Sequence, residues 1–293
     1  MKKKKVIKNI CHLIGFRLIS ATEVQIDDMF RIRKLLPTEL KGLESIYKQS
    51  IQYYYCDWKS FRFCIENTEE IDLWDLALEL DKIIIAMWLF SGHSITKGAL
   101  LREPSSKLGI YCILDSVMCE QGKGMWQVTD LEIKKFNDFL GNVKNKELSL
   151  NNIAIRYYKK AMNSVSNIDS LVNLTIAMEN ILLPKENIGL SDKFSLRAAL
   201  ILAEKFETRQ KIKDVFKKAY NTRSRIVHGG NPKIDEKNFI IYFHLCRKII
   251  CIYLENKYKW RKLLLDELTL GNNKLTYNLV KYLEDLKEKS IQN

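Results

Sequence analysis

The distribution of apolar and polar positions changes near the middle of the chain. From residue 153 onward, apolar residues recur every three or four positions, which is the period of an amphipathic α-helix. Helices are predicted over 153–165, 169–183, 191–206, 210–228, 237–258, 261–268 and 274–287. Short polar turns separate these stretches, so the C-terminal half predicts a helical bundle.

Residues before about 150 mix two patterns. Strand-like composition occurs over 16–24, 29–34, 61–66 and 108–118, whereas helices are predicted over 37–49, 68–90 and 129–140. Thr68 and Thr129 are the expected helix caps, and residues 91–106 predict a loop. The polar segment 141–152 is the predicted boundary. The expected fold is therefore mainly α, with a smaller α+β domain over 1–150 and an all-helical domain over 151–293.

Composition excludes several classes of protein. The seven cysteines form no CxxC pair, which argues against a disulfide framework or a structural zinc site and favours reduced thiols in the cytoplasm. The longest apolar run, Ile83 to Phe90, is far shorter than the ~20 residues of a membrane span. Lys8, His12 and Arg17 interrupt the apolar part of the N-terminus, so we expect a solvated basic tip that leads into structure rather than a signal peptide.

Positive charge is concentrated in one part of the sequence. The net charge is +13, of which residues 1–150 contribute +2 and residues 151–293 contribute +11. Between Lys205 and Arg225 there are eight basic residues and two acidic ones. Such a field attracts polyanions, nucleic acid above all. The alternative is a solvated basic helix face without a ligand.

The basic segment contains an arginine and a histidine that suggest a reaction site. Arg223 and His228 stand five positions apart in KKAYNTRSRIVHGGNP, and Gly229 supplies a left-handed helix stop. The predicted helix has an apolar stripe formed by Ile212, Val215, Phe216, Ala219 and Ile226. Arg223 occupies a position where this stripe predicts a core residue, so its guanidinium needs a carboxylate or a phosphate. A capped amphipathic helix without a site is the simpler interpretation.

Two further charges lie among apolar residues. Glu179 is in IAMENILL and Arg197 is in FSLRAALILAE. An ion pair of Glu179 with Arg197, or with Arg223, would satisfy them, and breaking a buried pair typically costs about 3–5 kcal/mol. The pair could fix how the helices dock or could support a site. In both cases Glu179 is expected near the Arg223 motif.

Four segments in order resemble the HEPN domains, most closely the Apea-like HEPN subgroup of prokaryotic defence proteins. The matching segments are IRYYKKAM, LVNLTIAMENILL, LRAALILAE and AYNTRSRIVHGG, followed by a weaker match at DEKNFIIYFHLCRKII. The resemblance covers roughly residues 151–254. Glu179, Arg197 and Tyr220 fall at supporting positions of this pattern.

The resemblance implies a metal-independent endoribonuclease without a cofactor. His228 would exchange a proton during attack of the RNA 2′-hydroxyl on the adjacent phosphate, and Arg223 would stabilise the pentacoordinate phosphate. Ser224 would hydrogen-bond the phosphate or orient His228, although its hydroxyl can equally bond back to the preceding turn. No carboxylate cluster suited to magnesium accompanies the motif. The residues expected to bind the RNA backbone are Arg225, Lys213, Lys217 and Lys218.

The spacing of the motif also bears on assembly. Five positions at about 100° each place Arg223 and His228 about 140° apart around an ideal helix. Two copies across a two-fold axis bring both groups to one phosphate, an arrangement similar to the composite sites of HEPN homodimers, so we expect a homodimer. The alternatives are a non-catalytic HEPN scaffold that binds nucleic acid, a nucleotide or a partner protein, and an enzyme silenced by an antitoxin-like partner or by the N-terminal half.

Overall fold

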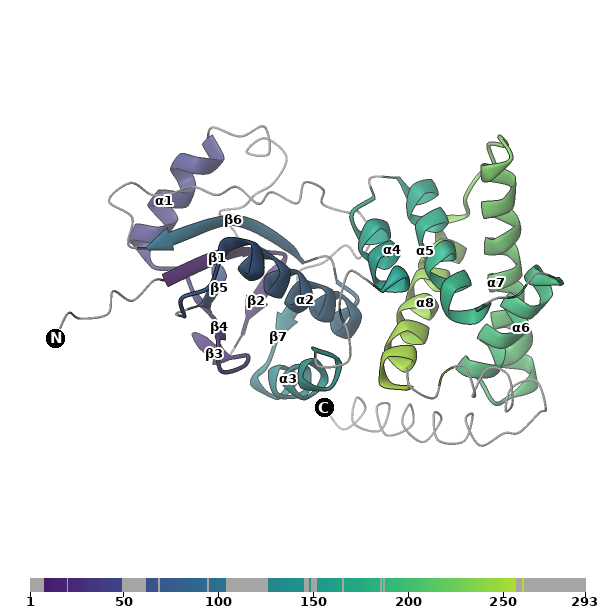
Figure 1. The fold of residues 1–293 in the computed structure, drawn as a ribbon, viewed down its shortest axis with the longest axis horizontal. Coiled ribbons are helices and arrows are strands. Elements are labelled where there is room, and N and C mark those ends of the chain that lie inside the picture. Colours follow the sequence, from purple (N-terminus) through teal and green to yellow (C-terminus); the bar gives the residue numbers. More distant parts are fainter. Residues whose placement is uncertain are drawn as a thin grey trace. The chain divides into compact units, whose positions relative to one another are not determined.

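A computed structural model of the chain divides into two compact units, Met1–Asn145 and Lys146–Asn293 (Figure 1). The border lies inside the polar segment 141–152. The structure describes residues 8–19, 21–48, 62–67, 69–93, 95–103, 126–144, 148, 152–164, 166–184, 186, 188–256 and 260. Within these residues the protein is mainly helical, with a small, mostly antiparallel sheet region in the first unit.

The first unit is built on an antiparallel sheet of five strands in the order β3-β4-β5-β1-β6, with a separate parallel pair of β2 and β7. The strands are β1 (Lys8–Ile14), β2 (Phe16–Leu18), β3 (Glu23–Gln25), β4 (Phe30–Lys34), β5 (Phe63–Asn67), β6 (Thr96–Glu103) and β7 (Trp126–Val128). The helices are α1 (Pro37–Lys48), α2 (Leu73–Ser91) and α3 (Asp130–Lys144).

One strand of this unit was not predicted, and two expectations for the unit were wrong. The missed strand is β1, in which His12 is fully buried, because this strand pairs with both β5 and β6; residues 1–7 of the expected basic tip lie outside the described residues. The expected loop over 91–106 contains β6, which pairs with β1 and in which Leu100 and Leu101 are buried. Asp72 caps α2 through the Trp74 N–H, so the cap is not Thr68. The expected strand over 108–118 lies outside the described residues.

One face of this sheet carries a buried charge network. The Arg33 guanidinium on β4 contacts the carboxylates of Glu39 on α1 and Glu66 on β5, and Lys8 contacts both carboxylates as well. Burial acts to raise the pKa of Glu39 and of Glu66, but the hydrogen bonds and positive charges around each carboxylate, those of Arg33 foremost, together outweigh it and lower the pKa of each. The network therefore ties α1 to the sheet with its charges balanced.

We expect replacement of Arg33 by methionine to lower the free energy of unfolding of this unit by about 3–5 kcal/mol, because two buried carboxylates lose their main partner. A lowered carboxyl pKa gives stability that is complete above its unfolded value and is lost as the pH falls through the folded value. The variant should therefore lose less stability than the wild type on acidification. Amide hydrogen exchange of β4 and β5 measures both effects, and Arg17→Met, on an exposed side chain, is the control.

The second unit consists of helices in the described residues. They are α4 (Ile153–Met162), α5 (Asn167–Leu182), α6 (Leu190–Leu202), α7 (Phe206–Val227) and α8 (Glu236–Asn256). The five helices expected before residue 260 are confirmed, with shifted ends: Ser166 rather than Asp169 caps α5, and Gly189 rather than Ser191 precedes α6. The helices expected over 261–268 and 274–287 lie outside the described residues. None of the helices that the structure describes is both long and apolar enough to cross a membrane.

Aromatic side chains fix α7 in this unit. Phe216 on α7 packs 5.6 Å from Phe194 on α6 and 5.0 Å from Tyr242 on α8, measured between ring centroids. All three are fully or almost fully buried. Contacts of α7 with α5 complete the packing. The helix that carries the Arg223 motif thus packs against α5, α6 and α8, and this packing fixes the position of its C-terminal end.

Candidate functional site

The C-terminal end of α7 is a tight, glycine-dependent stop. Helical geometry ends at Val227, His228 is the cap residue, and Gly229 has a φ of +82°, the left-handed conformation that favours glycine. The Gly229 N–H donates to the Ile226 carbonyl at 3.0 Å, and the Gly230 N–H donates to the Arg225 carbonyl at 2.8 Å. The chain therefore turns directly after His228, whose side chain is exposed.

Arg223 is directed toward α5. Its Nη2 lies 3.3 Å from Oε2 of Glu179, and the two side chains are 26% and 23% exposed. Its Nε is buried and has no hydrogen-bond acceptor among the described residues. Of the two pairings expected for Glu179, the structure forms the one with Arg223. The guanidinium is held at one nitrogen and retains N–H groups for a further acceptor.

Glu179 and Tyr220 lie in the same electrostatic environment. Burial raises the pKa of Glu179, and the charge of Arg223 only partly opposes this. Burial, followed by the nearby Glu179 carboxylate, raises the pKa of Tyr220, whose ring packs 5.2 Å from that of Phe194. The phenol is therefore neutral at physiological pH, and Tyr220 contributes shape and a hydroxyl beside Arg223.

Arg197 does not join this group. Its guanidinium donates to the Leu182 carbonyl at 2.7 Å and to Oε1 of Glu186 at 2.8 Å, and Lys193 pairs with the same carboxylate. The side chain is buried. Arg197 thus fastens the connection between α5 and α6, and its role in this structure is to position the C-terminal end of α5, where Glu179 lies.

Ser224 and His228 make no side-chain hydrogen bond to the described part of the chain. The backbone joins them, since the His228 N–H donates to the Ser224 carbonyl at 3.1 Å. One chain therefore directs Arg223 toward α5 and leaves the His228 imidazole in solvent. Among the described residues, no three His, Cys, Asp or Glu side chains are grouped so as to hold a metal ion.

The four residues expected to bind the RNA backbone differ in their surroundings. Lys217 pairs with Asp192 at 2.9 Å, and Lys218 lies 4.0 Å from a carboxylate oxygen of Asp235. The hydrogen bond from Lys217, its charge and then the charge of Lys213 lower the pKa of Asp192. Arg225 is exposed and forms no ion pair within the described residues. Arg225 is thus the cation of this set that is most available to a phosphate.

Lys233 is a basic residue near α7 that the sequence pattern did not identify. It lies in the connection between α7 and α8 and lines a hollow together with Lys218 and Thr222. Helical periodicity cannot predict where such a side chain points, because the connection has no repeating pattern of apolar residues. A lysine close after the GGNP turn was the one available signal.

Comparisons with known proteins found no relative of this chain. No protein-family model matches the chain, and neither the curated proteins nor the solved structures contain a match. The functional interpretation therefore depends on the residues and geometry described above.

Proposed function

We propose that the protein is a metal-independent endoribonuclease of the HEPN type, acting in defence or as a toxin. The observation that carries the proposal is the state of Arg223: a partly buried guanidinium, held by Glu179 at one nitrogen, with a buried Nε that lacks an acceptor. It lies at the end of a basic helix, five residues before an exposed histidine. A phosphate is the acceptor that we assign to the exposed part of this guanidinium, whose side chain is 26% exposed.

The chemistry assigned to these residues is transesterification within RNA. His228 removes the proton from a 2′-hydroxyl, and the oxygen attacks the adjacent phosphorus. Arg223 stabilises the additional negative charge of the pentacoordinate phosphate. The bond from phosphorus to the 5′-oxygen breaks, and that oxygen takes up a proton from water. The products are a 2′,3′-cyclic phosphate and a 5′-hydroxyl, with Ser224 as a hydrogen-bond donor to the phosphate.

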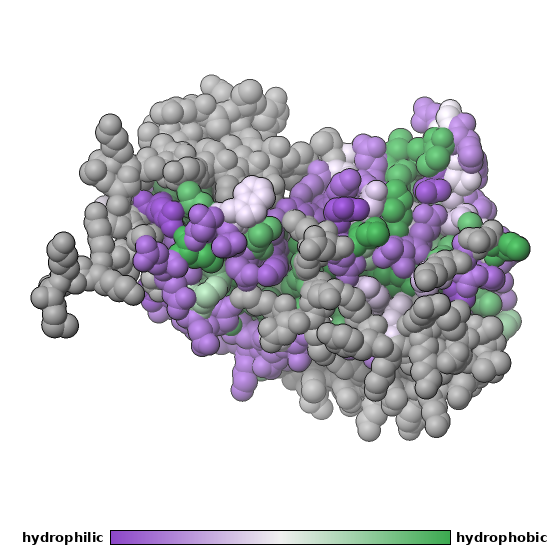
Figure 2. Space-filling view, in the orientation of Figure 1, coloured by the Kyte–Doolittle hydropathy of each residue, from purple (hydrophilic) through white to green (hydrophobic). Residues whose placement is uncertain are grey.

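The site is proposed to be shared between two copies of the chain. The imidazole of His228 is in solvent while Arg223 is directed toward α5, which supports a site in which a second copy helps to bring both groups to one phosphate. Apolar side chains near the motif support this arrangement, since Val227 is 55% exposed and Ile188, before α6, is 81% exposed. Figure 2 shows hydrophobic side chains reaching the surface of the unit that carries α4–α8. An antitoxin-like partner would occupy the same end of α7.

Incubation of the purified full chain with RNA in excess EDTA tests the proposal. We expect cleavage to continue, because the proton transfer and the charge stabilisation are assigned to side chains. Loss of cleavage on chelation, with recovery on addition of magnesium, would contradict the metal-independent mechanism. Absence of cleavage under both conditions would favour the non-catalytic scaffold, in which the Glu179–Arg223 pair serves to dock α7 on α5.

A further inference from the structure

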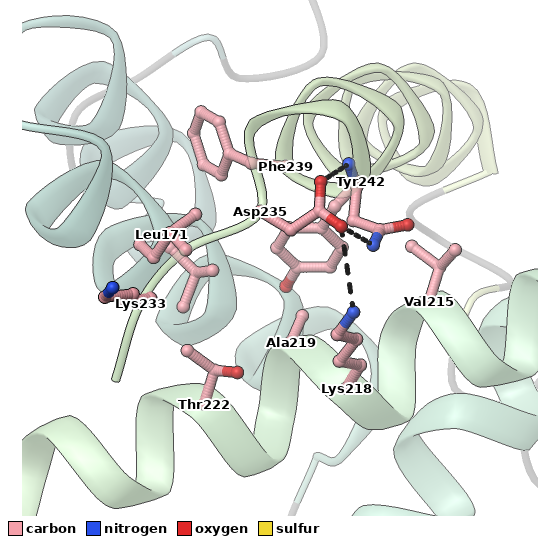
Figure 3. Close-up of a pocket in the computed structure, with 11 residues that line it drawn as sticks. Leu171, Val215, Lys218, Ala219, Thr222, Lys233, Asp235, Phe239 and Tyr242 are labelled. Carbon is pink, nitrogen blue, oxygen red and sulfur yellow. Dashed lines mark hydrogen bonds and ion pairs between the residues drawn. The ribbon is translucent and has the colours of Figure 1, made fainter. Parts of the chain in front are cut away.

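A half-open hollow lies between α7, α8 and the connection that joins them (Figure 3). About 350 Å³ of space lies in the hollow and its open mouth, with the adjoining solvent included. Thr222, Ala219 and Lys218 of α7 point toward Tyr242 and Asp235 on its other side. This space is called the α7–α8 hollow below.

The lining of the α7–α8 hollow combines an apolar floor with a charged rim. The floor is formed by buried side chains, among them Leu171, Ala219, Phe239 and Tyr242. The rim carries Lys218 and Lys233, which come from different segments of the chain. An apolar, aromatic floor with a few polar groups at the mouth is the usual composition of a small-ligand site.

The ion pair at the rim does not close the hollow firmly. Lys218 and Asp235 are 4.0 Å apart, and their side chains are 61% and 50% exposed. Exposed pairs of this kind contribute little to stability. Lys233 is exposed and has no ion pair among the residues described. Both ammonium groups are therefore able to turn toward a phosphate.

The hollow is close to the proposed reaction site along the chain. Thr222 precedes Arg223 directly, and Lys233 follows His228 by five residues. Five residues span at most about 18 Å. A nucleotide at the hollow and a phosphate at His228 therefore lie within a short stretch of one RNA strand.

We propose that the α7–α8 hollow receives one base of the bound RNA, while Lys218 and Lys233 contact the phosphates on either side of that nucleotide. The inference depends on the proposed function for the identity of the ligand as RNA. It adds a base-binding subsite to the phosphate contacts at Arg223 and Arg225. Apolar contact of the base with the exposed part of the lining supplies affinity without requiring a particular sequence.

A binding cycle with two RNA probes tests the subsite. The probes are an eight-nucleotide oligouridine and an eight-nucleotide strand of the same backbone without bases. Both are titrated against the full chain carrying His228→Ala, so that neither is cut, with and without the additional change Ala219→Leu, which fills the floor. We expect Ala219→Leu to weaken binding of oligouridine about tenfold and to leave binding of the abasic strand unchanged.

Rim variants separate base contacts from backbone contacts and do not alter the buried floor. In the same background, Lys218→Ala with Lys233→Ala should weaken both probes alike and reduce the slope of log K against log salt by about 1.4, because two phosphate contacts are lost. Lys237→Ala is the matched control, since Lys237 is exposed on α8 and does not line the hollow.

Each outcome decides a different claim. Equal loss of both probes with Ala219→Leu, or no loss of either, overturns the base subsite. Should Ala219→Leu prevent folding, an unchanged affinity and salt slope in the rim variant overturns it instead. Failure of the His228→Ala protein to bind either probe also overturns it. If the wild type cleaves RNA but the binding experiment gives no base effect, the ribonuclease proposal stands without the base subsite. If the base effect is found but the wild type does not cleave RNA, only the proposal of catalysis is removed.

Discussion

Replacement of His228 by alanine should lower RNA cleavage by about 10²-fold or more while leaving the fold intact. General acid–base catalysis by a positioned side chain contributes 10²–10⁴-fold, and His228 is the histidine assigned to proton transfer. Its side chain is exposed and makes no hydrogen bond to the residues that the structure describes, so little packing is lost with the imidazole. Initial rates of cleavage of a labelled RNA, together with circular dichroism of both proteins, measure the two parts of this expectation.

His244→Ala is the matched control for this experiment. His244 is exposed on α8 of the same unit, and its ring contacts that of Phe243. The substitution therefore removes the same type of side chain at a position outside the motif. We expect its cleavage rate to stay within about twofold of the wild type. Equal rates for His228→Ala and wild type would remove His228 from the mechanism.

Replacement of Arg223 by alanine should reduce cleavage by about 10²–10³-fold, the usual effect of removing one donor to a charged transition state. Arg223→Lys should recover little, because an ammonium group cannot hold Glu179 and a phosphate with the same planar geometry. The rate constant at saturating RNA is the quantity to compare. Arg209→Ala is the matched control, since Arg209 lies on the same helix and donates to the Ala203 carbonyl.

The Arg223 and His228 variants together test whether the site is shared. If Arg223 and His228 act from different chains, mixed dimers of Arg223→Ala with His228→Ala contain one intact site, and mixing should restore part of the activity. Two inactive proteins that stay inactive after subunit exchange would place both groups in one chain. An unchanged monomeric mass of the wild type in solution would argue against the dimer itself.

The sequence predicted the helices of the second unit because their apolar residues follow the helical period over many turns. It predicted the helix stop at Gly229 because only a glycine takes the left-handed conformation at low cost. It did not predict β1, where Lys8 and His12 interrupt the apolar pattern, because sheet pairing and the charge network of Arg33 and Glu39 bury polar groups in a way that no local pattern records.

The candidate site was predicted in part. The sequence placed Glu179 near Arg223 but left its partner open, because the choice between Arg197 and Arg223 depends on how α5, α6 and α7 pack. It also could not separate the basic residues of α7, since pairing of Lys217 with Asp192 and exposure of Arg225 are tertiary properties. The α7–α8 hollow has no linear signature, because its lining comes from three separate segments.

Analysis of the fragment ends from the EDTA reaction distinguishes attack by the 2′-hydroxyl from attack by water. Attack by the 2′-hydroxyl predicts fragments with a 2′,3′-cyclic phosphate and a 5′-hydroxyl, and it predicts no cleavage where the 2′-hydroxyl is replaced by hydrogen. Fragments with 3′-hydroxyl and 5′-phosphate ends, or cleavage of the 2′-deoxy substrate at a comparable rate, would contradict the mechanism assigned to Arg223 and His228.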